Sequence, residues 1–322
     1  MSARAVVTAP EALRRTPAGG RRLSAILLAG IVTLLWSSSY ILIKIGLQGL
    51  PPLTFAGLRY FAAFLALLLA YPIRGRAWPR RPGGAAWRAL VGLGLTTYAI
   101  VPAAMFVSLK LLPVNSTNLI FQAGIPLTVA LLSGLVLNEP TSLRQWIGVL
   151  LTVAGIYLFF PALPEGGEAL GAGLALVAAV GGAAGNLLTR HLMRDHPLRA
   201  GDVSMISMGI GSTLLLLVSR FVEPFPTLTW SSVALLLWLS LINTALAFTL
   251  WNLALRTLTA LEGGVIANAQ IVEVALMAWF ILGEQLAGIR IVAALVILLG
   301  VTLVQWRRPA VAVEAGSLGS GQ

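Results

Sequence analysis

The sequence predicts an all-α membrane protein in which ten transmembrane helices form two inverted five-helix repeats. Hydrophobic residues make up 58% of the 322 residues and charged residues only 10%, whereas soluble domains carry roughly a quarter of their residues as charged side chains. The chain also divides into ten apolar runs, and a gapless shift of 145 residues aligns its first half with its second. The repeat accounts for the number of runs.

The apolar runs are long enough to cross a bilayer or nearly so, since a spanning helix needs about 20 mostly apolar residues. No connection between them has room for a soluble catalytic domain. The first run is too long for a secretory signal, and no small-x-small cleavage site follows it. The runs are 24–47, 53–73, 86–109, 114–136, 143–160, 169–193, 200–222, 230–256, 261–282 and 286–305.

The internal repeat rests on more than aliphatic matches, which are cheap in a chain this rich in Leu, Ala and Val. The shift of 145 residues places Glu139 on Glu284 and Gly155 on Gly300. A duplicated unit is therefore expected. The predicted organisation is an Arg-rich tail (1–23), a first repeat (24–160), a linker (161–168), a second repeat (169–306) and a second tail (307–322).

An odd number of helices per repeat places the second copy upside down in the bilayer. The basic residues agree, because the Arg-rich segment 74–88 maps onto 219–233, which keeps only Arg220. In this topology 17 of the 22 Lys and Arg residues fall on the side of the two termini, which the positive-inside bias assigns to the cytoplasm. The charge therefore reflects orientation rather than a nucleic-acid partner. Inverted repeats are typical of secondary transporters, and a channel stays the alternative.

Polar side chains inside the runs are the candidates for function, because an amide or carboxylate there is costly unless it meets water, a partner or a ligand. Asn115, Asn118 and Gln122 share one helix face, and Glu273 lies near the middle of its run. The alternative interpretation is helix packing through polar and small residues. The residues expected to line a cavity at the midplane are Trp36, Tyr40, Tyr98, Asn118, Gln122, Asn186, Asn243, Trp251 and Glu273.

Other residues are expected to serve structure. Arg59 could contact a substrate carboxylate, a structural partner or a backbone carbonyl, and the sequence leaves all three open. Pro102 is expected to open its helix locally or to kink it. The pairs Gly148 and Gly155, and Ala293 and Gly300, favour close helix contact. Glu139 and Glu284 are expected to satisfy helix ends rather than to bind substrate.

The sequence offers no set of catalytic residues, and neither a metal site nor a cofactor is expected. Cysteine is absent, which excludes disulfides and thiolate ligands. There is no phosphate-binding Gly-x-x-x-x-Gly-Lys-Ser/Thr motif, no His-Glu-x-x-His and no Gly-x-Ser-x-Gly. An enzyme, and direct use of ATP, are therefore disfavoured.

Two turns carry a resemblance to a known family. Leu137-Asn138-Glu139-Pro140 and Leu282-Gly283-Glu284 each follow an apolar helix and precede a helix with a glycine, Gly155 or Gly300. With ten predicted helices in two halves, the chain from Leu23 to Trp306 resembles the EamA-type drug/metabolite transporter superfamily, and within it the bacterial exporters of aromatic and other amino acids. One departure is that Pro126 in the first half is matched by Ile271 in the second.

The resemblance implies a multi-pass protein of the bacterial plasma membrane that exports small metabolites, commonly amino acids, by alternating access around a central cavity. Its expected partners are a small-molecule substrate and membrane lipid. Export of another amphipathic metabolite or drug is the alternative. Coupling to protons stays open, with Glu273 as the residue that could carry it.

Overall fold

The structure is a computed structural model that describes residues 19–73, 82–136, 142–160, 165–196, 198–285 and 288–305. Most of the two predicted tails, part of the linker and Glu139 lie outside these residues. Helices and short connections make up the described part of the chain, which contains no strand. An all-α fold is therefore confirmed.

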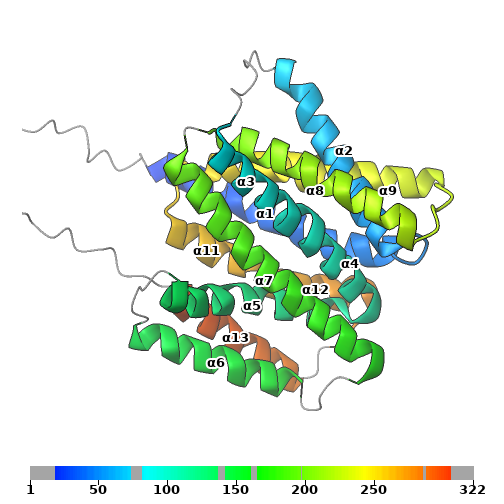
Figure 1. Cartoon of the computed structure of the whole chain (residues 1–322). Coiled ribbons are helices and arrows are strands. Elements are labelled where there is room, and N and C mark those ends of the chain that lie inside the picture. Colours follow the sequence, from blue (N-terminus) through cyan, green and yellow to red (C-terminus); the bar gives the residue numbers. More distant parts are fainter. Residues whose placement is uncertain are drawn as a thin grey trace, which may run out of the picture.

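The helices coincide with the apolar runs of the sequence (Figure 1). The first half contains α1 (Gly19–Gly46), α2 (Pro52–Ile73), α3 (Gly84–Leu93), η2 (Gly94–Ile100), α4 (Val101–Leu111), α5 (Val114–Val136) and α6 (Leu143–Phe159). The second half contains α7 (Gly166–Asp195), α8 (Ala200–Val222), α9 (Trp230–Ser240), η3 (Leu241–Leu246), α10 (Ala247–Ala254), α11 (Ala260–Asn268), α12 (Gln270–Leu282) and α13 (Gly288–Gln305).

Eight helices within the described residues are long and apolar enough to cross a membrane. Of the remaining two segments, α6 is apolar but shorter, and α5 borders residues outside the description. Large apolar side chains such as Phe221, Trp230 and Phe280 are more than four-fifths exposed on the surface. Since lipid is the solvent for such a surface, the chain is a multi-pass membrane protein.

The closest helix contact joins α6 and α13 along one edge of the bundle (Figure 1). A Cβ added at Gly300 would lie 2.7 Å from the backbone nitrogen of Thr152, and one at Gly148 would lie 2.7 Å from the carbonyl of Gly300. One at Gly155 would lie 3.1 Å from the carbonyl of Ala293. Small residues let the two backbones approach, so the expected close contact is confirmed.

Two segments of π-helix interrupt the third and eighth runs at matching places. η2 ends at Ile100, two residues before Pro102, and Val101 donates to the carbonyl of Thr96, five residues back. η3 does the same without a proline, with Ala247 donating to the carbonyl of Ile242. Proline therefore does not by itself explain the local opening. Each π-segment contributes buried residues, among them Tyr98 in η2 and Asn243 in η3.

Pro126 does not mark a helix break, and the break lies instead in the second half, near the matching Ile271. The proline stays inside a continuous α5, whereas the matching run in the second half breaks between α11 and α12 at Ala269. There the amide of Ala269 bonds to the carbonyl of Ile266, three residues back. Neighbouring helices can re-satisfy the carbonyl that a membrane proline frees, so α5 tolerates Pro126.

Two carboxylates at one end of the bundle accept hydrogen bonds from the backbone nitrogens in the first turns of two helices. Glu284 accepts hydrogen bonds from the backbone nitrogens of Val114 (2.6 Å) and Asn115 (3.1 Å) at the start of α5. Glu223 accepts from those of Leu53 (3.0 Å) and Thr54 (2.8 Å) at the start of α2. The expectation that Glu284 satisfies a helix end is confirmed, and both contacts also favour the positive end of the helix dipole.

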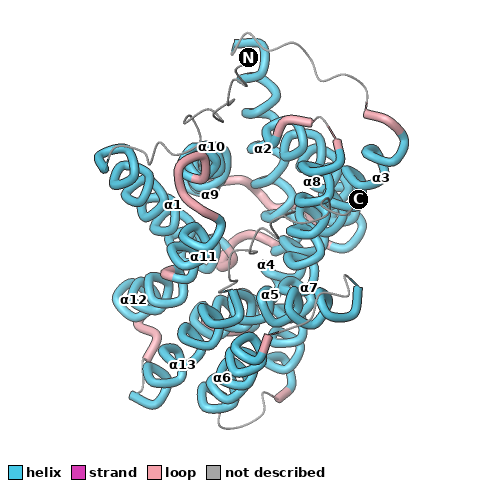
Figure 2. Tube along the Cα trace, turned by 90° about the vertical axis from the view of Figure 1, so that its left-hand side faces the viewer, coloured by secondary structure: helices cyan, strands magenta, loops and turns pink. Residues whose placement is uncertain are grey.

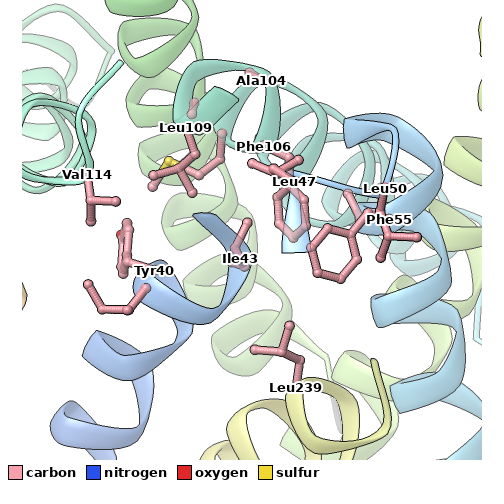
Figure 3. Packing of buried hydrophobic residues seen from close by; sticks show 14 of the residues in the cluster. Tyr40, Ile43, Leu47, Leu50, Phe55, Ala104, Phe106, Leu109, Val114 and Leu239 are labelled. Atoms are coloured by element: carbon pink, nitrogen blue, oxygen red, sulfur yellow. The ribbon is translucent and has the colours of Figure 1, made fainter. Parts of the chain in front are cut away.

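The main apolar core lies where α1, α2 and α4 meet. Figure 3 shows Ile43 of α1, and Leu47 in the turn that follows α1, facing Phe55 of α2 and Phe106 of α4. The rings of Phe55 and Phe106 lie 5.3 Å apart at 81°, an edge-to-face arrangement that aromatic pairs prefer. This core fixes the end of α1 and leaves its middle to contact the second half.

Candidate functional site

The middle of α1, from Thr33 to Ser38, is where the polar residues of the second half converge. α1 packs against α10 and α12, as Figure 2 also shows with α11 beside it. Glu273 of α12 accepts a hydrogen bond from the hydroxyl of Thr33 (2.9 Å) on one carboxylate oxygen. It accepts one from Ser37 (2.7 Å) on the other. Two hydroxyls one helical turn apart thus hold both oxygens.

No Lys, Arg or His lies within ion-pair distance of Glu273 in the described part of the chain. A carboxylate at the centre of a membrane helix costs on the order of 2.5–3.5 kcal/mol, and a hydrogen bond to a charged group returns about 1.5–3 kcal/mol. The two hydroxyls can therefore offset the cost of the carboxylate. The described residues place no cation on this carboxylate, and the half-buried side chain can receive one from a ligand.

Asn243 of η3 reaches the same stretch of α1. Its amide nitrogen donates to the carbonyl of Leu35 and to the hydroxyl of Ser38, the latter at 3.0 Å. Its amide oxygen is buried and has no hydrogen-bond partner among the residues that the structure describes. A buried acceptor without a partner costs about 1–3 kcal/mol, so this oxygen is a place where a donor from a ligand would be favoured.

Aromatic rings form a wall beside these groups. Trp36 of α1 lies 5.1 Å from Trp251 and 5.4 Å from Phe248 of α10, measured between ring centroids. All three rings are half-buried. Such rings can contact the apolar part of a ligand or attract an ammonium group through their faces.

A second set of amides lies between α5 and α12. Asn118 is 1% exposed, and its nitrogen donates to the carbonyl of Gln270 (3.3 Å). Within the described ranges its oxygen has no hydrogen-bond partner. Gln122 follows one turn later and is half-buried, with no side-chain hydrogen bond in the described part of the chain. Because Pro126 has no N–H, the carbonyl of Gln122 lacks its helical partner. Asn118 and Gln122 belong to α5, which packs against α12, the helix that carries Glu273.

Three of the predicted cavity residues lie elsewhere. Tyr40 belongs to the main apolar core. Tyr98 packs with Ala63 and Met208 in a separate cluster between α2 and α8, and its ring centroid is 5.9 Å from that of Tyr60. Asn186 is exposed on α7. The structure therefore places Trp36, Asn243, Trp251 and Glu273 around the middle of α1, where Asn243 and Glu273 bond to different faces of that helix. Asn118 and Gln122 lie on α5, which packs against α12, and the other predicted residues are separate.

Arg59 and Lys44 are held by the protein. Arg59 is 5% exposed and donates to the hydroxyls of Thr244 (3.2 Å) and Ser39 (3.4 Å). Lys44 donates to the carbonyls of Leu109 (2.6 Å) and Leu112 (2.7 Å) at the end of α4. Among the described residues, the Arg59 guanidinium has neither an acidic partner nor a backbone carbonyl as a hydrogen-bond acceptor.

Sequence reasoning missed Thr33, Ser37 and Phe248. Thr33 and Ser37 are one turn apart on α1, and that spacing puts them on one helix face. Apolar runs tolerate single hydroxyls bonded to their own backbone, as Ser38 and Ser39 do with Leu35. No signal in the sequence separates those from the two that bind Glu273.

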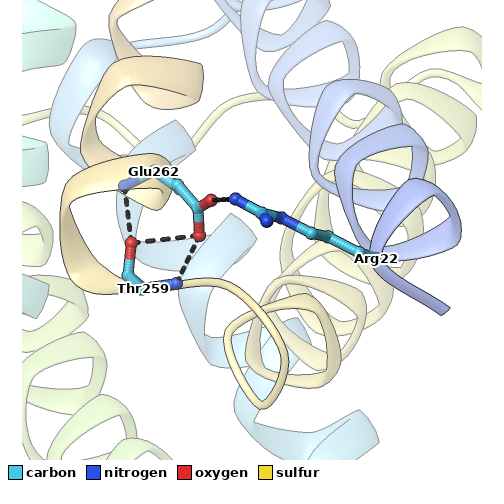
Figure 4. A network of polar contacts seen from close by, with 3 residues as sticks. All are labelled: Arg22, Thr259 and Glu262. Carbon is cyan, nitrogen blue, oxygen red and sulfur yellow. Dashed lines mark hydrogen bonds and ion pairs between the residues drawn. The ribbon is translucent and has the colours of Figure 1, made fainter. Parts of the chain in front are cut away.

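Glu262 closes a different end of the site. It forms a capping box with Thr259 at the start of α11 and an ion pair with Arg22 of α1 (Figure 4). Around this pair, Ala25 and Ala29 of α1 pack against Ala254 and Leu258. The ion pair of Arg22 with Glu262 therefore joins α1 of the first half to α11 of the second half. In the described residues no group of three acidic or histidine side chains could hold a metal ion.

Comparison with known proteins places this architecture among transporters. The EamA-like transporter family matches the chain twice, over residues 23–160 and 169–306. A crystal structure superposes on it with a TM-score of 0.63, covering 88% of this chain and 97% of that chain at 21% sequence identity. That likeness is one of fold.

Relatives of similar length carry transporter names. A protein of Salmonella typhimurium named "Probable amino-acid metabolite efflux pump" is 27% identical over 285 residues, covering 85% of this chain and 92% of the relative. An Escherichia coli (strain K12) protein of the same name is 26% identical over 310 residues, covering 90% and 98%. An Archaeoglobus fulgidus protein named "Uncharacterized transporter" is 27% identical over 290 residues, covering 86% and 96%.

Proposed function

We propose, from the premise that this chain belongs to the EamA-like transporter family, that it exports small metabolites, most specifically amino acids, by alternating access across a bacterial inner membrane. It is a membrane efflux transporter and not an enzyme. The names of its relatives support amino acids as the substrate class. In the proposed orientation both termini are cytoplasmic.

Contacts between the halves support two inverted repeats of five spans. Under the 145-residue shift, Gly148 corresponds to Ala293 and Gly155 to Gly300. The observed contacts pair Gly148 with Gly300 and Gly155 with Ala293, the exchange that a two-fold axis between α6 and α13 requires. Two halves related in this way can exchange inward-open and outward-open states around a shared site.

A contact between α2 and α8 supports the same two-fold relation. A Cβ at Gly209 of α8 would lie 2.8 Å from the ring of Phe64 of α2, and these two residues are themselves 145 positions apart. A contact between equivalent residues lies on the axis. The axis therefore passes through the α2–α8 contact and the α6–α13 contact.

The observation that carries the proposal is the uncompensated carboxylate of Glu273 beside the ring pair of Trp36 and Trp251. The carboxylate and the ring faces together fit an ammonium group. In the empty carrier a proton can take the place of the ammonium on Glu273. The site would then exchange substrate for proton.

A counterflow assay in liposomes tests the proposal. Purified protein is reconstituted, loaded with unlabelled amino acids from a panel, and the uptake of labelled substrate is measured at two pH values. We expect saturable uptake that trans substrate accelerates, and Glu273→Gln should lower it at least tenfold, about 1.4 kcal/mol. Flux that does not saturate and that trans substrate does not accelerate would instead identify a channel.

A further inference from the structure

A second site lies on the far side of α12 from Glu273, in two adjoining cavities of different character. The first, of about 140 Å³, is lined by apolar side chains that include Leu119, Ile271 and Ala294. The second, of about 150 Å³, is lined by polar groups that include Ser116, Glu284 and Gln285. Asn115, Phe159 and Arg290 line both cavities. Together they form one amphipathic groove between α5, α6, α12 and α13.

The apolar part of the groove opens toward lipid. Its outer wall consists of Val272, Leu276, Ile291 and Leu295, whose side chains are 39–56% exposed on the outside of the bundle. Glu273 follows Val272 directly but turns to α1, where Thr33 and Ser37 bind it. The groove and the candidate transport site are therefore on different faces of one helix.

The polar part of the groove has an unpaired cation and an unpaired acceptor. Arg290 contacts the ring of Phe159, with 5.7 Å from the guanidinium carbon to the ring centroid, and no acidic group lies within ion-pair distance of it in the described residues. The amide oxygen of Asn115 is buried without a hydrogen-bond partner, in a side chain only 9% exposed. Glu284 is already engaged by the two backbone nitrogens of α5.

We propose that this groove binds one phospholipid with an anionic, hydroxyl-bearing headgroup, such as a phosphatidylglycerol. An acyl chain fills the apolar cavity, and the phosphate pairs with Arg290, whose planar guanidinium suits a phosphate. The headgroup hydroxyl donates to the free oxygen of Asn115. Basic pockets between membrane helices bind anionic headgroups in this way. In the proposed orientation the lipid comes from the external leaflet.

The bound lipid would hold together the end of the bundle that Glu284 closes. The groove runs from the first turn of α5, which Glu284 caps, to the start of α13, where Arg290 lies. A molecule seated there contacts both halves of the chain at once. Its occupancy would therefore favour the conformation in which α5 and α12 are joined at this end.

Native mass spectrometry of the purified full-length protein in detergent tests the proposal. Dioleoyl phosphatidylglycerol and dioleoyl phosphatidylcholine, which share acyl chains, are titrated separately. We expect phosphatidylglycerol to bind at least fivefold more tightly, because phosphatidylcholine has a zwitterionic headgroup, in which the choline ammonium offsets the phosphate, and it has no hydroxyl. Arg290→Ala should weaken phosphatidylglycerol about tenfold, and Arg290→Lys should weaken it less.

The matched control is Arg220→Ala, because Arg220 is an exposed arginine in the last turn of α8 that lines neither cavity. It should leave the lipid affinity unchanged. Ala294→Phe fills the apolar cavity and should lower the affinity for both lipids, with Ala275→Leu as a second filling variant on the opposite wall if the first does not fold. The proposal is wrong if Arg220→Ala and Arg290→Ala weaken phosphatidylglycerol equally, or if neither filling variant changes binding.

A counterflow measurement separates a structural lipid from a transported amphiphile. Arg290→Ala protein, reconstituted in liposomes, should keep saturable counterflow of the transported substrate, because the groove is not part of the Glu273 site. If Arg290→Ala abolishes counterflow while phosphatidylglycerol still binds with wild-type affinity, the groove belongs to the transport path and the lipid site is refuted.

Discussion

Glu273 is held differently from Glu223, Glu262 and Glu284. Glu223 and Glu284 bind helix ends through backbone nitrogens, and Glu262 has Thr259 and Arg22. Glu273 has two hydroxyls, which stabilise a negative charge without cancelling it. Of these four carboxylates, Glu273 is the one that is held neither by backbone nitrogens nor by a cation.

Ser37→Ala is expected to lower counterflow about tenfold, because it removes one hydrogen bond to a charged group, worth about 1.5–3 kcal/mol. The control is Ser24→Ala on the same helix, whose hydroxyl bonds only to the carbonyl of Gly20. Transport rate and thermal unfolding in detergent should be measured on both. Equal transport by the two variants would show that Ser37 does not position Glu273.

Glu284→Ala is expected to reduce the stability of the protein by about 0.5–2 kcal/mol, the range for loss of a helix cap. The first turn of α5 loses its two acceptors. Glu165→Ala serves as the control, since Glu165 stands at the N-cap of α7 without a side-chain hydrogen bond. Chemical unfolding in detergent measures both, and a stability loss at Glu165 as large as at Glu284 would contradict the assignment.

The helices show which local features a sequence can predict. The apolar runs predicted where the described helices lie, because a spanning helix needs a stretch of apolar residues long enough to cross the bilayer. Proline did not fix the breaks: α5 is continuous through Pro126, and α11 and α12 separate at Ala269. Whether a membrane helix breaks depends on the groups that neighbouring helices offer its free carbonyls, and those are long-range contacts.

The contact of α6 with α13 depends on the absence of side chains at Gly148 and Gly300. Gly300→Ala is expected to destabilise the protein by about 1–3 kcal/mol, because its Cβ would lie 2.7 Å from the nitrogen of Thr152 and 2.8 Å from the carbonyl of Gly148. Gly288→Ala on the same helix meets nothing within 4 Å. Thermal unfolding should separate the two variants, and equal melting temperatures would contradict the close contact.

The architecture and the site were predictable to different degrees. The repeat was visible because Glu and Gly matches survive at a fixed offset. The site was visible only in part: Asn243 and Tyr98 occupy equivalent positions, yet Asn243 bonds to α1 while Tyr98 packs near α2 and α8. Equivalent positions in the two halves carry different side chains. The chemistry of a site between the halves therefore depends on contacts between helices, which the pattern of one apolar run does not predict.

If the two halves are inverted, equivalent positions in them lie on opposite sides of the membrane. The chain contains no cysteine, so a single introduced cysteine reports the side on which its own position lies. Gly49 lies between α1 and α2, and Arg194, 145 residues later, lies at the end of α7; both are exposed. Single-cysteine variants Gly49→Cys and Arg194→Cys are treated with a membrane-impermeant maleimide in intact cells and after permeabilisation. We expect Gly49→Cys to react in intact cells and Arg194→Cys only after permeabilisation. Reaction of both variants in intact cells, or of neither, would contradict two inverted halves.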